Sequence, residues 1–165
     1  MSKRLDMKAL ILNLISNSSK GGEFCRASGA ANAPTALQYG YPRQVTLTQF
    51  REISDTTKFT IVNGGVRVEE AGLYKVTAST YLTVASSSSL YGTYVRKGST
   101  WDSGTEVLGG WKSKVSGSLD LVPQMTSIAQ FSAGDIVMLG ARVNSAKGSV
   151  YAGNNSTFLI LEKLA

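Results

Sequence analysis

The stretch Gly72-Leu-Tyr-Lys-Val-Thr-Ala-Ser-Thr-Tyr-Leu-Thr-Val84 follows the turn-like residues Glu69-Glu70-Ala71. Successive side chains of a strand point to opposite faces, so every second residue of this stretch falls on one side of an extended backbone. The residues on that side are Tyr74, Val76, Ala78, Thr80, Leu82 and Val84. Their β-branched and aromatic types are those that pleated, half-buried strands prefer. We predict a strand that enters from a tight turn with positive φ at Gly72.

The same pattern extends to both sides of this stretch. Val66 and Val68 alternate with polar residues before it, and the runs 136–139 and 158–161 are apolar on both faces. Such two-sided runs fit either a central core strand or a sheet buried on both sides. Turn-forming residues such as Gly134-Asp135 separate the runs, which indicates an antiparallel sandwich or barrel. We therefore predict an all-β domain over residues 45–165.

Residues 1–44 show a different pattern, and we assign them to an N-terminal anchoring helix and arm. Apolar residues near the start of the chain recur at helical spacing, although Asp6, Lys8 and Asn13 interrupt them. The apolar residues of this segment are Leu5, Met7, Leu10, Ile11, Leu14 and Ile15. A helix this short does not span a bilayer and needs a partner, which is its own domain, sister chains or a larger assembly. Residues 16–44 lose the periodicity and predict an extended arm.

The composition excludes several classes of protein. The 165 residues include no histidine and a single cysteine, Cys25. The chain therefore lacks the commonest general base, the usual zinc ligands and an intrachain disulfide. A reduced site of synthesis, such as a host cytoplasm, agrees with this cysteine content. We predict that the chain is not an enzyme.

The charge balance points to acidic partners rather than to nucleic acid. The formal net charge is +6, and most of the positive excess lies in the first fifty residues. The sequence has no run of Lys and Arg and no basic stripe interleaved with aromatic residues, so nucleic-acid binding is not predicted. An acidic surface, such as an anionic polysaccharide or an acidic protein, fits the charge.

Carboxylates provide the one enzymatic alternative. Asp102 and Glu106 are the best local pair for the chemistry of a polysaccharide-degrading spike, which needs two carboxyl groups across a cleft. Their Gly- and Ser-rich surroundings are typical of a solvated loop. No calcium-binding loop spacing is present, and we predict no metal and no cofactor.

Binding residues are predicted among aromatic side chains in Ser- and Gly-rich segments. Tyr91, Trp101, Trp111 and Lys112 lie in the segments 86–92 and 97–114. If these segments are loops, the side chains can contact a host surface glycan or protein by stacking and by burying area. The alternative is that the two tryptophans cap the ends of the sandwich core.

Four segments, taken in order and spacing, carry a family resemblance. The first combines Phe59, Val66 and Gly72-Leu73-Tyr74-Lys75-Val76, with Val66 and Val76 standing where the family has phenylalanine. The others are 94–98, 131–137 and 156–161. Residues 45–165 thereby resemble the globular head of the complement first component's q subunit, which is similar to the tumour necrosis factor fold. The resemblance implies an antiparallel ten-stranded jelly-roll sandwich that forms homotrimers around an apolar axis, where some members bind calcium.

Bacteriophage fibres and decoration proteins use such jelly rolls with N-terminal arms fixed to the particle. The resemblance and the arm therefore imply a homotrimeric virion structural protein, a head-fibre or tail-fibre tip that attaches to the host. The segment 5–15 would bind other virion proteins, with no membrane insertion. The alternative is a capsid decoration or cementing protein that stabilises the particle.

Overall fold

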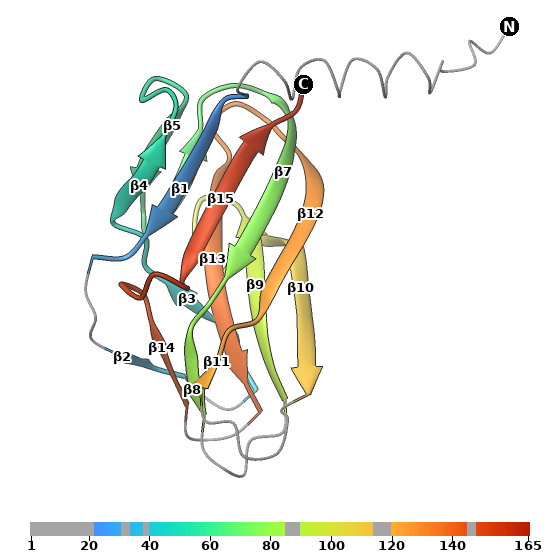
Figure 1. Ribbon diagram of the computed structural model, residues 1–165. Coiled ribbons are helices and arrows are strands. Elements are labelled where there is room, and N and C mark those ends of the chain that lie inside the picture. The colour runs from blue at the N-terminus through green and yellow to red at the C-terminus, as the bar shows by residue number, and fades with distance from the viewer. Residues whose placement is uncertain (1–21, 31–33, 38–39, 85–89, 114–119, 145–147) are drawn as a thin grey trace, which may run out of the picture.

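The computed structural model describes residues 22–30, 34–37, 40–84, 90–113, 120–144 and 148–165. These residues form fifteen strands and no helix (Figure 1). Every pairing between neighbouring strands is antiparallel. The all-β class and the antiparallel sandwich that the sequence predicts are therefore confirmed.

The first sheet contains five strands in the order β12-β7-β15-β1-β4. Their bounds are β12 (Gln124–Phe131), β7 (Gly72–Ser79), β15 (Phe158–Lys163), β1 (Phe24–Ser28) and β4 (Gln49–Ile53). Strands from the two ends of the chain lie side by side near its middle, with Phe24 opposite Glu162. The sheet forms the front layer of Figure 1.

The second sheet lies behind the first and has the order β10-β9-β13-β6-β5, with β3 also paired to β13 (Figure 1). The bounds are β10 (Thr105–Ser113), β9 (Leu90–Lys97), β13 (Ile136–Val143), β6 (Gly65–Val68), β5 (Phe59–Val62) and β3 (Arg43–Val45). Because β13 pairs with β9 along one edge and with both β3 and β6 along the other, it brings distant segments together.

A third, smaller sheet of the order β11-β8-β14-β2 closes the lower end in Figure 1. The bounds are β11 (Asp120–Leu121), β8 (Leu82–Val84), β14 (Gly148–Tyr151) and β2 (Pro34–Ala36).

The core lies between the first two sheets and follows the alternation of the sequence. Tyr74, Val76 and Ala78 are buried, whereas Lys75 between them is exposed. The core cluster also includes Cys25, Ala27, Phe59, Val66, Val95, Phe131, Val137, Leu139, Leu159 and Leu161. Tyr74 packs against Phe131 with ring centroids 5.5 Å apart. Burying these apolar side chains is the main stabilising contribution to the sandwich.

The strand number differs from the ten that the resemblance implies. The stretch 72–84 that predicts one strand splits into β7 and β8, because its backbone leaves the first sheet at Thr80 and Tyr81. The Thr80 amide donates to the Pro123 carbonyl, and the Tyr81 amide donates to the Thr157 hydroxyl. The predicted N-terminal helix and its residues Leu5, Met7, Leu10, Ile11, Leu14 and Ile15 lie outside the described residues.

The predicted domain boundary after residue 44 does not mark where the sheets begin, because earlier residues already form strands of them. β1 lies between β15 and β4, and its residues Cys25 and Ala27 are fully buried. Residues 24–28 are thus part of the fold and not an arm laid on another surface. β1 is short and is flanked by small and polar residues, so its alternation of inward and outward side chains cannot be recognised from the sequence.

The two predicted turns differ in outcome. Gly134 has a φ of 90°, as predicted for a tight turn, whereas Gly72 does not have a positive φ. Gly72 is required for another reason: a Cβ there would lie 2.3 Å from the carbonyl oxygen of Ala165. The glycine lets the C-terminal residue approach the start of β7, where the Leu73 amide donates to that same carbonyl.

Candidate binding pocket

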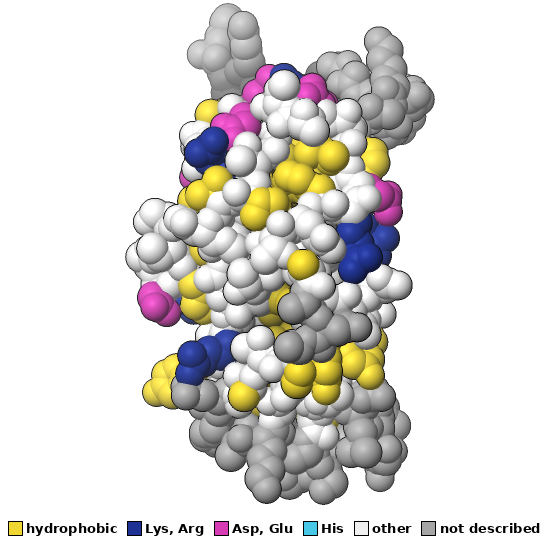
Figure 2. Space-filling view, turned by 90° about the vertical axis from the view of Figure 1, so that its left-hand side faces the viewer, with side chains coloured by type: hydrophobic (Ala, Val, Ile, Leu, Met, Phe, Trp, Pro, Cys, Tyr) yellow, Lys and Arg dark blue, Asp and Glu magenta, His cyan; other side chains and the backbone are white. Residues whose placement is uncertain are grey.

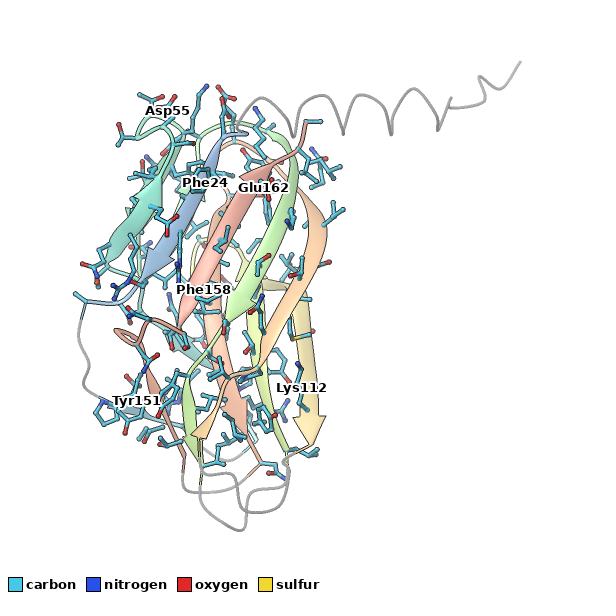
Figure 3. The ribbon with its side chains drawn as sticks, viewed as in Figure 1. Phe24, Asp55, Lys112, Tyr151, Phe158 and Glu162 are labelled. Carbon is cyan, nitrogen blue, oxygen red and sulfur yellow. The ribbon has the colours of Figure 1, made fainter. Side chains whose placement is uncertain are left out.

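The predicted contact residues do not form one cluster. Tyr91 and Lys112 lie opposite each other on β9 and β10, and Trp111 lies opposite Gly92 beside them. Trp101 lies in the turn that joins the two strands, at the other end of the hairpin. Figure 3 shows Lys112 near the lower end of β10. The prediction that these residues lie on loops is therefore wrong for three of the four, because the Ser- and Gly-rich segments also form strands.

At the lower end of the hairpin the structure describes the side chains of Tyr91 and Lys112. Tyr91 is half-buried and packs against the core. Lys112 is exposed, and its Nζ lies 3.5 Å from the Gln124 carbonyl oxygen. The side chain of Trp111 is outside the described part of the structure.

Trp101 packs on the outer face of the second sheet. It is 8% exposed and forms a second apolar cluster with Tyr94, Ile136 and Met138. Its ring lies against Gly140, where a Cβ would be 2.0 Å from the indole Cη2. The indole Nε1 donates a hydrogen bond of 3.1 Å to the Pro42 carbonyl. Trp101 is thus largely buried on the outer face of the second sheet and also lines a pocket, and it does not belong to the core cluster between the two sheets.

Arg96 lies against the same tryptophan. Its guanidinium carbon is 4.9 Å from the centre of the Trp101 ring, a cation–π contact. Its Nη1 donates to the Trp101 carbonyl oxygen at 3.1 Å. Its Nε is buried and has no hydrogen-bond partner in the described part of the structure. A buried donor without a hydrogen-bond partner costs about 1–3 kcal/mol. The guanidinium of Arg96 does not have a full set of hydrogen bonds, and its stacking on the Trp101 ring helps to hold it.

These side chains line an open pocket of about 480 Å³, which we name the Arg96 pocket. Its lining residues are Thr35, Tyr41, Pro42, Arg43, Gln44, Arg96, Trp101 and Asp102. The register of β13 explains why they meet, since Gly140 lies opposite both Gln44 of β3 and Tyr94 of β9. Sequence reasoning identified only Trp101 as a contact residue, and it treated Asp102 as a carboxylate on a solvated loop.

The pocket carries an excess of positive charge. Two arginines, Arg43 and Arg96, and one acidic residue, Asp102, are among its lining residues. Within the described residues neither arginine forms a salt bridge, whereas Arg26, Arg67 and four lysines do. Tyr41 adds an aromatic side chain that is 72% exposed. The site therefore has the groups to bind an anion or a polar ring.

The predicted carboxylate pair is not brought together in this pocket. Asp102 lines the pocket, but its predicted partner Glu106 is not one of the lining residues. Burial raises the pKa of the Cys25 thiol to about 12, which leaves it a poor nucleophile. Among the described residues no three acidic, cysteine or histidine side chains come together as a metal site. No helix of the described part is long and apolar enough to cross a membrane.

The comparisons with known proteins identify the fold. The sequence matches no protein-family model and no curated protein. Among solved structures, murine APRIL at pH 5.0 is similar with a TM-score of 0.64 and 14% identity, over 86% of this chain and 98% of that one. Eiger TNF from S. frugiperda is similar with a TM-score of 0.60 and 17% identity, over 87% of this chain and 94% of that one. The chain therefore has the jelly-roll fold of the tumour necrosis factor type, as the sequence resemblance implies.

Proposed function

We propose that the chain is a non-enzymatic, homotrimeric structural protein of a bacteriophage virion, a head-fibre or tail-fibre tip that binds the host cell surface. The observation that carries the trimer is the outward face of the first sheet, which we name the first-sheet face. It comprises the outward side chains Phe24, Arg26, Lys75, Thr77, Thr126, Ile128, Phe158, Ile160 and Glu162. Figure 3 shows Phe24, Glu162 and Phe158 along this layer.

The first-sheet face exposes apolar side chains on the edge strand β12 and on the central strand β15. Ile128 is 59% exposed, and Phe158 and Ile160 are half-buried. Phe158 and Ile160 lie two positions apart on β15, and Ile128 of β12 lies opposite Lys75, so the three belong to separate rows of the same face. An exposed apolar face on a rigid sheet marks an interaction surface, because covering it removes apolar area from water.

Several polar side chains of this face are already paired, although the buried Nε of Arg26 has no hydrogen-bond partner in the described residues. Lys75 and Glu162 form an ion pair of 3.2 Å, and Arg26 lies 4.7 Å from the centre of the Phe158 ring. The hydroxyl groups of Thr77 and Thr126 are 3.2 Å apart. Paired groups lose less on desolvation than free ones, so this face suits burial against sister chains. The trimer of the resembling family supplies the arrangement: three copies that close around an axis.

The other parts of the proposal concern how the chain is attached to the virion and what it binds. The segment 5–15 binds other virion proteins, and the opposite sheets remain free to meet the host. Nucleic acid is not the partner, in agreement with Figure 2, where the basic groups on the visible side form separate patches among neutral atoms. Synthesis takes place in the host cytoplasm, and the working location is the virion.

The proposal is tested by a binding assay with purified full-length chain on a panel of bacterial strains and on phage particles that carry the protein. We expect binding to cells of at least one strain, strengthened by three copies per assembly. Ile128→Glu is expected to lower both the mass of the assembly and the cell binding. Leu90→Glu, an exposed apolar residue of the second sheet, is the matched control.

Two outcomes separate the alternatives. Binding to particles alone, lost when residues 1–21 are removed, supports the decoration or cementing protein instead of the fibre tip. Binding to neither cells nor particles contradicts both. The truncation stops at residue 21, because removal up to residue 44 would delete β1, β2 and most of β3.

A further inference from the structure

We propose that the Arg96 pocket binds a carboxylated sugar, such as a uronic or nonulosonic acid unit of an acidic glycan. The inference deepens the proposed function, on which it rests only for the location of that glycan at the host surface. It assigns the contact to the pocket on the outer face of the second sheet, and not to the lower end of the β9–β10 hairpin where Tyr91 and Lys112 lie.

Charge selects an anion. Arg43 and Arg96 line the pocket, and neither has a carboxylate partner in the described part of the chain. Arg43 is exposed and makes no hydrogen bond there. Guanidinium groups bind carboxylates through paired, charge-assisted hydrogen bonds. A ligand carboxylate in the pocket supplies the charged acceptor that neither arginine has in the described part of the chain.

The remaining lining residues select a polar ring attached to that carboxylate. Tyr41 presents an exposed ring, and the Trp101 ring borders the same space. Aromatic rings stack on the apolar faces of sugars. Thr35, Gln44 and Asp102 provide hydroxyl, amide and carboxylate groups that can bond to sugar hydroxyls. A volume of about 480 Å³ lies within the range of about 300–1,000 Å³ for small-molecule sites.

The walls of the pocket are fixed before a ligand arrives. The Trp101 indole rests on the backbone of Gly140 and donates to the Pro42 carbonyl, while Arg96 binds the Trp101 carbonyl and stacks on the ring. A side chain held in this way loses little conformational entropy on binding. Arg43 and Gln44 come from β3 and Arg96 from β9, two strands of one sheet, and Trp101 and Asp102 lie in the turn between β9 and β10.

The test uses the full-length chain labelled with ¹⁵N and two probes, sodium D-glucuronate and N-acetylneuraminate. The chain contains two tryptophans, so the indole N–H signal of Trp101 is assigned with Trp101→Phe. We expect at least one of the probes to shift this signal in a saturable way. D-glucose and sodium sulfate at equal concentration are expected to shift it much less.

Variants separate the pocket from general charge effects. Arg43→Gln and Arg96→Gln are each expected to weaken binding about tenfold or more, the effect of losing a hydrogen bond to a charged group. Among the described residues Arg43 has no partner to lose, so its variant remains informative if Arg96→Gln fails to fold. Arg67→Gln removes one charge from the same sheet outside the pocket and is the control, expected to bind as the unchanged chain does.

The substitution Asp102→Asn is expected to change the affinity in opposite directions for an acidic ligand and for a neutral one. It removes the one carboxylate of the pocket, so the affinity for glucuronate or neuraminate is expected to rise. A lower affinity would instead point to a neutral sugar held by Asp102. No response to either acid, or an equal response to sulfate, overturns the proposal. If the chain binds cells or particles but does not respond to either sugar acid, the pocket proposal is rejected and the proposed function stands. If it responds to a sugar acid but binds neither cells nor particles, the proposed function is rejected and the pocket proposal stands.

Discussion

At the scale of single residues, Gly140 determines how close Trp101 lies to the sheet. A Cβ at residue 140 would lie 2.0–2.9 Å from three atoms of the indole ring. The ring is held by its hydrogen bond to Pro42 and by Arg96, so it has little freedom to move away.

We predict that Gly140→Ala lowers the free energy of unfolding by about 1–3 kcal/mol, the usual cost of overpacking. Urea denaturation measures the change. Gly110→Ala is the matched control, because its Cβ would meet only the flexible end of Met125. Equal stability of Gly140→Ala and the unchanged chain would contradict the described packing of Trp101.

Cys25 is a second residue whose environment decides its chemistry. It is fully buried, and burial raises the pKa of its thiol from 9.0 to about 12. In the unfolded chain the thiol ionises near its ordinary pKa, so ionisation favours the unfolded state as the pH rises above about 9. Tyr74 acts in the same direction, because burial raises the pKa of its hydroxyl from 10.0 to about 12.

We predict that a thiol reagent such as Ellman's reagent does not modify the native protein at pH 8 and reacts with one thiol per chain in urea. We also expect the free energy of unfolding to fall between pH 9 and 12, as both groups resist ionisation in the fold. Rapid modification of the native protein would show that Cys25 of β1 is not buried in the core as described.

At the scale of elements, β1 shows what a sequence pattern misses. Its five residues lie between β15 and β4, and they supply Cys25 and Ala27 to the core. The strand 72–79 was predictable because its alternation is long, whereas β1 and β3 are too short to be distinguished from an extended arm.

We predict that a chain of residues 45–165 does not fold, because it lacks β1, β2 and most of β3. A chain of residues 22–165 keeps every described strand and is expected to retain the β-sheet circular dichroism and the cooperative unfolding of the full chain. A cooperative unfolding transition of residues 45–165 would contradict this prediction and support the domain boundary after residue 44.

The ends of β1, β7 and β15 are joined by an ion-pair network. Lys163 Nζ lies 2.6 Å from Glu70 Oε2, Lys58 also binds Glu70, and both lysines lie within 4 Å of Glu23. Lys163 and Lys58 lower the pKa of Glu70 from 4.5 to about 2 through hydrogen bonds to its carboxylate. Figure 2 shows acidic and basic groups together at the upper end of the molecule.

A lowered pKa in the fold stabilises the protein above the unfolded pKa, and this contribution is lost as the pH falls from 4.5 toward 2. We predict that Glu70→Gln weakens the acid dependence of unfolding in that range. Glu52→Gln, whose carboxylate pairs with Arg26 elsewhere, is the control. Identical acid profiles for Glu70→Gln and the unchanged chain would contradict the network.

At the scale of the whole molecule, the fold class followed from the sequence and the binding pocket did not. The alternation of Tyr74, Val76 and Ala78 predicts a half-buried strand from local spacing alone. The pocket depends on the pairing of β13 with β3 and β9, which brings Arg43 and Arg96 into the lining of one pocket although 53 positions separate them. Such registers are set by tertiary packing, so composition and periodicity contain no signal for them.

The central claim is that the first-sheet face closes against two further copies of the chain. Multi-angle light scattering of the full-length chain measures this directly. We predict three times the chain mass of 17.5 kDa for the unchanged protein and for Leu90→Glu, and a lower mass for Ile128→Glu. A single-chain mass at all concentrations, or a trimer unaffected by Ile128→Glu and by a second charge at Ile160, would contradict it.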